Sequence, residues 1–216
     1  GLGAVKNVGE AAIETIIHGR REEGSFESLH DFCRRVDTQK VNRRVIEQLI
    51  KCGAFDSITS GRSRLLAALD DALEKSQVIQ RDRQAGQMNM FDLLMSSRKS
   101  PVPELPDVPA WDRRVTLQYE KEALGFYISG HPMDHYADRL AGLCTTDSQA
   151  VKEKREGAEV VISGMLSIVK ELTTKRGDRM AFLSLEDKEG LVEIVAFSEV
   201  FGQSRHLLDA DEPLVV

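Results

Sequence analysis

Four consecutive residues near the start of the chain, Lys6-Asn7-Val8-Gly9, have the types that a phosphate-binding turn requires. Asn and Gly accept the positive φ angles of a tight turn, and Glu10 to Arg20 follows directly with apolar residues at helical spacing. The first amides of a helix carry a partial positive charge and lack partners within the helix. We therefore predict that this turn binds a phosphate group, with Lys6 adding a full charge; an ordinary helix turn accounts for the same local pattern.

A second helix-turn-helix pattern follows, in which Asn42 starts a helix that stops at Gly53. Two such units in one domain can contact phosphates a few nucleotides apart without reading the base sequence. The predicted contacts of this second unit lie in the turn and on the two flanking helices: Lys51, Gly53, Ala54, Arg43, Arg44, Arg62 and Arg64. Each arginine taken alone is better explained as a solvated helix residue, and the basic pattern of Arg34, Arg35 and Lys40 is similarly weak.

The stretch GQMNMFDLL, from Gly86 to Leu94, places large apolar side chains between a charged helical run and a proline-rich segment. Two or three such side chains, each contributing roughly 1.5–3 kcal/mol when buried, can hold a peptide in a partner's pocket at roughly micromolar affinity. The predicted contacts are Gln87, Met88, Asn89, Met90 and Phe91. In the alternative, Phe91 and Leu94 fold back onto the neighbouring helices.

The last third of the chain contains a basic loop beside an aromatic strand residue. Lys175, Arg176 and Arg179 surround a predicted hairpin, and Phe182 lies on the strand that follows. Short strands with a basic loop and an exposed aromatic suit a small barrel that stacks bases and follows a single-stranded backbone. A barrel used only for packing is the alternative.

Other catalytic chemistry has little support in the sequence. His131, Asp134 and His135 could be imagined as the metal ligands of a hydrolase, but Pro132 disrupts the helical spacing that would bring the histidines together. There is no P-loop, no GxGxxG after a strand, no nucleophile elbow and no HExxH motif. The three cysteines, Cys33, Cys52 and Cys144, are too widely spaced for a CxxC zinc site and are interpreted as reduced packing residues. We predict no catalytic residue, metal site or cofactor in this chain.

Charge is unevenly distributed along the 216 residues. The net charge of -6 would argue against nucleic acid as a partner, yet residues 1–83 hold 14 Lys and Arg against 13 Asp and Glu. The acidic excess therefore lies in the remainder, and the first third could bind an anion locally. No apolar run is long enough to span a bilayer, so we expect no membrane association and a cytoplasmic setting.

The elements that must position these residues change character along the chain. Helical patterns over residues 10–83 are followed by a spacer from Ser96 to Pro109 with four prolines. Helix resumes from Trp111 to about Tyr127, and a short amphipathic segment covers Asp134 to Leu143. From Ala158 the apolar period becomes two and predicts strands, with a hairpin turn at 187–190, a helix over 198–208 and a fourth strand that begins at Pro213.

Three segments together resemble the C-terminal half of the bacterial replicative DNA polymerase III alpha subunits, which are C-family polymerases. They are GLGAVKNVGEAAIETII with VNRRVIEQLIKCGAFDSI, then GQMNMF, then EKEALGFYISGHPMDHY followed by GAEVVISG and TKRGDRMAFLSLED. Their order also matches the family, and the resemblance covers essentially the whole chain. This chain departs from the family at Asn7, where helix-hairpin-helix motifs often have Gly. It also departs at Met88 and Met90, which replace the more usual leucines of the peptide that binds the sliding clamp in this family.

The resemblance implies an α+β multidomain fold. Residues 1–85 would form a tandem helix-hairpin-helix domain, 86–96 an extended sliding-clamp-binding peptide, 97–157 a linker and helical connector, and 158–216 an incomplete OB-fold barrel. Implied partners are DNA, as product duplex and template single strand, the sliding clamp and other polymerase III holoenzyme subunits. The parent would be a DNA-directed DNA polymerase that uses Mg²⁺ held outside this segment. An error-prone paralogue and a structural connector that touches no DNA are the alternatives.

Overall fold

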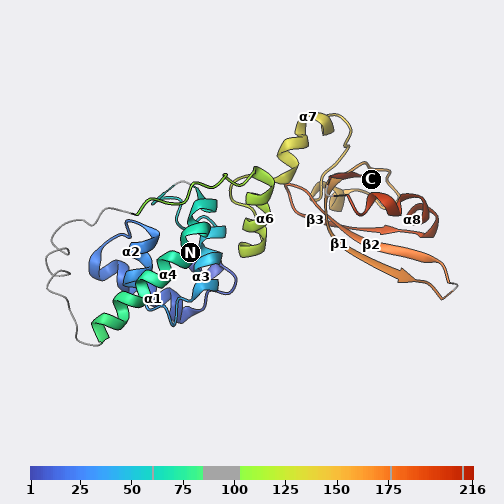
Figure 1. Cartoon of the computed structure of the whole chain (residues 1–216). Helices are drawn as coiled ribbons and strands as arrows, with labels where there is room; N and C mark the ends of the chain where they lie inside the picture. The colour runs from blue at the N-terminus through green and yellow to red at the C-terminus, as the bar shows by residue number, and fades with distance from the viewer. Residues whose placement is uncertain (60, 85–102, 176, 211) are drawn as a thin grey trace. The chain divides into compact units, whose positions relative to one another are not determined.

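A computed structural model describes residues 1–59, 61–84, 103–175, 177–210 and 212–216 of the chain (Figure 1). The chain forms two compact units, Gly1–Ser129 and Gly130–Val216. The first unit is helical and the second contains an antiparallel sheet. The combination of helices with an antiparallel sheet confirms the predicted α+β class.

The helical unit follows the capping signals of the sequence. Its elements are η1 (Leu2–Ala4), α1 (Glu10–Glu23), α2 (Leu29–Arg35), α3 (Arg43–Lys51), α4 (Arg62–Gln84) and α6 (Arg113–Leu124). Ser28 accepts a hydrogen bond from the Asp31 amide at the start of α2, and Asn42 accepts one from Val45 at the start of α3. These contacts satisfy amides that have no partner within the helix, and the cap at Asn42 confirms the predicted start of α3.

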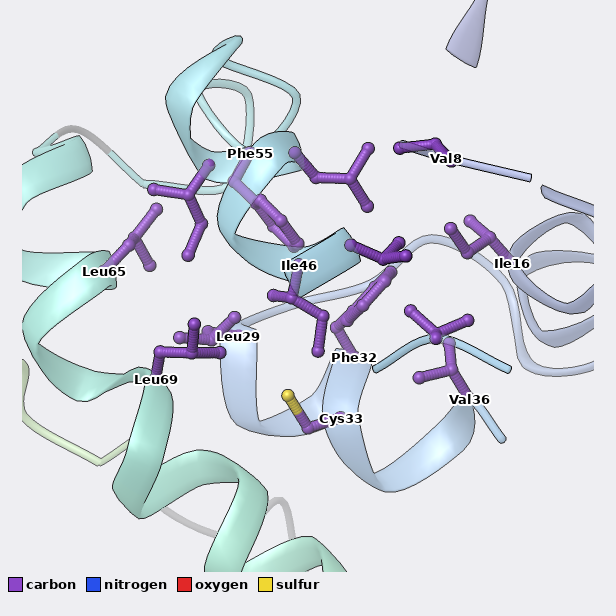
Figure 2. Packing of buried hydrophobic residues seen from close by; sticks show 14 of the residues in the cluster. Val8, Ile16, Leu29, Phe32, Cys33, Val36, Ile46, Phe55, Leu65 and Leu69 are labelled. Carbon is purple, nitrogen blue, oxygen red and sulfur yellow. The ribbon is translucent and has the colours of Figure 1, made fainter. Parts of the chain in front are cut away.

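The core of this unit lies between α2, α3 and α4, with Val8 of the turn before α1 and Ile16 of α1 at one side (Figure 2). Leu29, Ile46 and Leu69 are at most 1% exposed, and the Phe32 ring meets Phe55 edge-on with centroids 5.0 Å apart. Each such side chain contributes about 1.5–3 kcal/mol through removal from water. Because Val8 belongs to the same core, the packing of the core anchors the turn that precedes α1.

Helix α6 packs on the helical unit, although the sequence places it in a separate connector over 97–157. Ala123 is fully buried in the core described above, and Leu105, Trp111 and Leu124 pack against that core. The boundary between units falls after Ser129, so the described part of the connector divides between the two units. The physical reason is that α6 has its own apolar face, which the core of residues 1–84 covers.

The second unit begins with short turns of helix and continues as a sheet. Its elements are η2 (Pro132–Tyr136), α7 (Ala137–Leu140), η3 (Ala150–Glu153), β1 (Ser163–Thr173), β2 (Arg179–Glu186), β3 (Leu191–Ala196), α8 (Ser198–Ser204), η4 (Arg205–Leu207) and β4 (Leu214–Val215). The strand order is β3-β2-β1-β4, and each neighbouring pair is antiparallel. The predicted strands, their two hairpins and the helix after the third strand are confirmed.

Alternation along β2 gives the sheet two different faces. Ala181, Leu183 and Leu185 are buried, and the first two pack with Phe201 of α8. Phe182 points to the opposite face with its cross-strand partners Lys170 and Val195, because residues directly opposite in an antiparallel pair share a face. A helix therefore covers one face, and the other carries Phe182 at 40% exposure.

The β2–β3 turn is tied to the segment that precedes β1. Asp187 accepts hydrogen bonds from the amides of Ser148, Glu189 and Gly190 at 2.7–2.9 Å. Burial alone would raise the pKa of Asp187, but the hydrogen bonds from Ser148 and from these amides outweigh it, and the pKa lies below its ordinary value. The turn thereby fixes the register of β2 and β3.

Candidate nucleic-acid interface

The first predicted hairpin is a turn between η1 and α1 that is fixed at two buried valines. Val5 and Val8 are 5% and 8% exposed, and the Lys6 amide donates to the Ala123 carbonyl of α6 at 2.7 Å. Asn7 takes a φ of 65°, in the left-handed region. The backbone direction is thus set from inside, which leaves the side chains of Lys6 and Asn7 exposed.

Gly9 is the N-cap of α1, and its backbone does not require glycine. Its φ is -74°, and a Cβ built there would meet nothing within 4 Å. A glycine in open space lets another molecule approach the backbone amides of the first helical turn. Glu10 lies in that turn as well, so an anion there would share the positive end of the helix with a carboxylate.

The polar groups of the second predicted hairpin form hydrogen bonds and an ion pair within the helical unit. The amides of Gly53 and Ala54 donate to the carbonyls of Ile50 and Leu49 at 3.0 and 2.9 Å. Lys51 is 7% exposed, pairs with Glu122 at 3.0 Å, and is not presented to solvent. The predicted phosphate contacts at Lys51, Gly53 and Ala54 are therefore groups already engaged within the helical unit.

Arg62 explains why position 53 is glycine. Its guanidinium pairs with Asp56 at 2.6 Å and with the fully buried Glu120 at 2.8 Å, and it donates to the Lys51 carbonyl at 3.3 Å. Gly53 has a φ of 78°, and a Cβ there would lie 2.3 Å from an Arg62 nitrogen. Arg62 therefore connects α3, α4 and α6 rather than facing solvent.

Glu120 keeps its charge in this buried setting. Burial alone would raise its pKa, but hydrogen bonds from Ser129, from the Ile128 amide and from Arg62 outweigh burial, so the pKa of Glu120 lies below its ordinary value. The carboxylate receives both backbone amides at 2.7 and 2.9 Å. No local pattern predicts this role of Glu120, because its partner Arg62 lies 58 positions away in the sequence.

The remaining predicted arginines of the helical unit differ in availability. Arg43 pairs with Asp70 at 2.7 Å and Glu47 at 3.0 Å. Arg64 donates to the carbonyls of Leu105 and Pro106, each at 3.1 Å. Arg44 is exposed, and within the described parts of the chain no carboxylate pairs with it. It is therefore the predicted arginine best placed to meet an anion.

A depression on the helical unit brings hairpin one and α3 together. It is lined by Asn7, Arg43, Arg44, Glu47, Gln48 and Glu122. The first three of these residues are predicted contacts, but no local pattern in the sequence brings them together. Gln48 was missed, although a polar residue three positions after the apolar Val45 and four before Cys52, on the buried side of α3, is the signal that could have found it.

On the sheet unit, Phe182 lies on the exposed face of the sheet, Lys175 lies in the turn between β1 and β2, and Arg179 lies at the start of β2 on the face that α8 covers. Lys175 and Phe182 are exposed. Arg179 pairs with Glu171, and its guanidinium lies 5.7 Å from the Phe201 ring centroid. Arg176 is outside the described residues, as is the whole predicted clamp peptide from Gln87 to Phe91 (Met88, Asn89 and Met90 included).

His131 and Asp134 form a capping box at the start of η2. The Asp134 side chain accepts from the His131 amide at 2.8 Å, and His131 Nδ1 accepts from Met133. Asp134 also pairs with Lys188 at 2.6 Å. In the part of the chain that the structure describes, no three His, Cys, Asp or Glu residues gather as a metal site would require. The same residues include no helix long and apolar enough to cross a membrane.

Comparison with known proteins agrees with the hairpin geometry. Residues 1–65 match the helix-hairpin-helix motif family. DNA polymerase III subunit alpha of Vibrio cholerae serotype O1 is 35% identical over 216 residues, which is 100% of this chain and 19% of that protein. The chain is homologous along its whole length to part of DNA polymerase III subunit alpha.

Two further polymerase III alpha subunits show the same relationship. The protein of Neisseria meningitidis serogroup B is 39% identical over 215 residues, with 100% of this chain and 18% of that protein covered. The protein of Escherichia coli strain K12 is 34% identical over 219 residues, with coverage of 100% and 19%. The chain thus spans about a fifth of the length of the curated alpha subunits it matches.

Proposed function

We propose that this chain is the DNA-binding and clamp-tethering part of a replicative DNA-directed DNA polymerase that extends primers processively. The observation that carries the proposal is similarity over the whole chain to polymerase III alpha subunits, 35% identical in the first of them, together with the helix-hairpin-helix match over residues 1–65. A chance likeness of one short motif would not extend over two structural units.

In the helical unit, hairpin one would bind a backbone phosphate of the product duplex. Its support is the open backbone at Gly9, the left-handed Asn7 and the exposed Lys6. A helix start combined with a free cation is suited to a phosphate. Because the groups of hairpin two are engaged within the fold, we assign the main contact of this unit to hairpin one and Arg44.

In the sheet unit, we infer the first part of an OB fold that meets the template single strand. The long β1 pairs with both β2 and β4, and a helix lies between β3 and β4, an arrangement that suits such a barrel. Phe182 would stack a base, while Lys175, Arg176 and Arg179 would follow the phosphates.

The segment Gln87–Phe91 would bind the sliding clamp. A tether converts each rebinding of the polymerase to its primer into an intramolecular event, which raises the effective concentration without any new DNA contact. The parent would work in the bacterial cytoplasm with other holoenzyme subunits, and its Mg²⁺-binding carboxylates would lie in other parts of the polymerase.

A second candidate function is that of a structural connector. It is favoured by the engagement of Lys51, Arg62 and Arg43 in ion pairs within the helical unit. Such a connector would bind duplex DNA no better than an average acidic protein. Salt dependence separates the two functions, because binding through phosphates weakens steeply as salt rises.

The test is binding of the chain to a sliding clamp from a bacterial replisome, compared with Met90→Ala/Phe91→Ala, beside binding to a primed DNA at two salt concentrations. We expect the double variant to lose the clamp and to keep its DNA affinity, with wild-type DNA binding weakening as salt rises. Equal clamp binding by the wild type and the double variant would exclude Met90 and Phe91 as the tether. Salt-independent or absent DNA binding would favour the structural connector.

A further inference from the structure

The chain leaves the helical unit through two residues that a buried carboxylate holds. Glu120 Oε2 accepts hydrogen bonds from the backbone amides of Ile128 and Ser129 at 2.7 and 2.9 Å, and Glu120 Oε1 accepts one from the Ser129 hydroxyl. Glu120 is itself fixed by its burial in α6 and by its ion pair with Arg62 of α4. Because hydrogen bonds to a charged acceptor are roughly twice as strong as neutral ones, the backbone is anchored as far as Ser129, the last residue of the unit.

The sheet unit anchors its own first residues through a second carboxylate. Asp134 accepts a hydrogen bond from the His131 amide at 2.8 Å, and His131 Nδ1 accepts one from the Met133 amide. Met133 is buried, and Asp134 pairs with Lys188 of the β2–β3 turn at 2.6 Å. The backbone is therefore held again from His131 onward, by contacts that lie within the sheet unit.

Gly130 lies between these two anchors, and its backbone has a conformation that glycine adopts far more readily than any other residue. Its φ is 151°, a positive value that a Cβ disfavours. Each residue has two soft backbone torsions, and hinges between rigid parts consist of a few residues that absorb large changes in them. We propose that Gly130 is a single-residue hinge, about which the two units turn as rigid bodies while Glu120 and Asp134 hold the chain on either side.

The hinge has a consequence for a chain whose two units bind the same DNA. Linked binding units strengthen each other only where their connection lets both engage at once. A hinge at Gly130 would let the helical unit stay on the duplex while the sheet unit follows a template strand that changes direction. This consequence rests on the proposed function, whereas the hinge itself does not.

Pulsed electron paramagnetic resonance on the full chain measures how the distance between the units is distributed. One spin label is placed at Glu14→Cys of α1 and the other at Gln203→Cys of α8, because both residues are exposed. Cys144→Ser removes the partly exposed native thiol, while Cys33 and Cys52 are buried. The measurement contains no DNA, so its outcome is independent of the proposed function.

The labelled chain with Gly130 intact should give a broad distance distribution. Gly130→Ala should narrow and displace it, because alanine loses the positive-φ conformations of the hinge. Gly24→Ala and Gly157→Ala are the matched controls: these glycines have φ values of 81° and 79° and stand in open space, but they lie away from residue 130. Both controls should keep the broad distribution.

The two anchors are tested by Glu120→Gln and Asp134→Asn in the same labelled chain, at a temperature where circular dichroism shows every variant folded. Each should broaden the distribution further, because residues beside Gly130 then join the moving segment. A narrow distribution with Gly130 intact, or the same distribution in Gly130→Ala, would overturn the hinge. An equal change in either glycine control, or no change in both anchor variants, would show that motion is not confined to residue 130 and would overturn it as well.

Discussion

The Arg62 guanidinium occupies the space in which a side chain at residue 53 would lie: a Cβ on Gly53 would come within 2.3 Å of Arg62 Nη2 and 2.6 Å of Asp56 Oδ2. The glycine of hairpin two thus makes room for an ion pair of the fold. Glycine in a helix-hairpin-helix turn has a different purpose at Gly9, where the space is open.

Replacing Gly53 with Ala should destabilise the helical unit. The positive φ of 78° disfavours any side chain, and the new methyl group displaces Arg62, so we expect a loss of about 2–4 kcal/mol from backbone strain and a disturbed ion-pair network. Denaturant unfolding followed by circular dichroism measures the loss. Gly3→Ala is the control, since Gly3 lies in open space; similar losses in both variants would contradict the explanation.

Replacing Glu120 with Gln should lower the free energy of unfolding by about 1.5–3 kcal/mol at pH 7, as for hydrogen bonds to a charged group. Because the pKa of Glu120 is lowered in the folded state, its stabilising contribution is complete above its unfolded value of 4.5 and is lost as pH falls through the folded value. Unfolding at pH 7 and at pH 3 should show the two chains converging in acid. A constant difference would mean that the charge of Glu120 does not contribute.

Two phenylalanines of the sheet unit should respond differently to truncation. Phe201 is 3% exposed, and Phe201→Ala should destabilise the unit by about 3–5 kcal/mol. Phe182 is 40% exposed on the opposite side of the sheet, so Phe182→Ala should leave the melting temperature nearly unchanged while weakening single-stranded DNA binding by about 1–3 kcal/mol. Fluorescence anisotropy with a labelled single strand, at matched folded fractions, would refute base stacking if Phe182→Ala bound as well as the wild type.

The cysteines should differ in reactivity with a thiol reagent. Burial raises the pKa of Cys33 to about 12, and Cys33 is fully buried, whereas Cys144 is partly exposed. Because the thiolate is the reacting form, native chain at pH 8 should label first at Cys144, and Cys33 should label only after unfolding. Mass spectrometry of the labelled peptides distinguishes them, and early labelling of Cys33 would show that the core opens without global unfolding.

Local sequence signals predicted the helices and strands well. They could not predict which charged side chains are buried, because long-range contacts decide that. Asn42 identifies a helix start because a side-chain cap acts within three residues. The pairing of Arg62 with Glu120 depends on residues that meet only after folding. That pairing decides whether hairpin two faces solvent, so the sequence alone could not separate a surface arginine from a buried one.

The contacts of Arg64 with the carbonyls of Leu105 and Pro106 have a topological consequence for the segment between α4 and α6. Helix α4 ends about 33 Å from its start, and residues 105–106 lie beside that start. A protease cut between residues 85 and 102 would therefore yield two pieces that stay together, held by α6 and its ion pairs. A molecule bound to this segment would be linked to the helical unit through the chain on both sides of the segment, so a single cut would not release it.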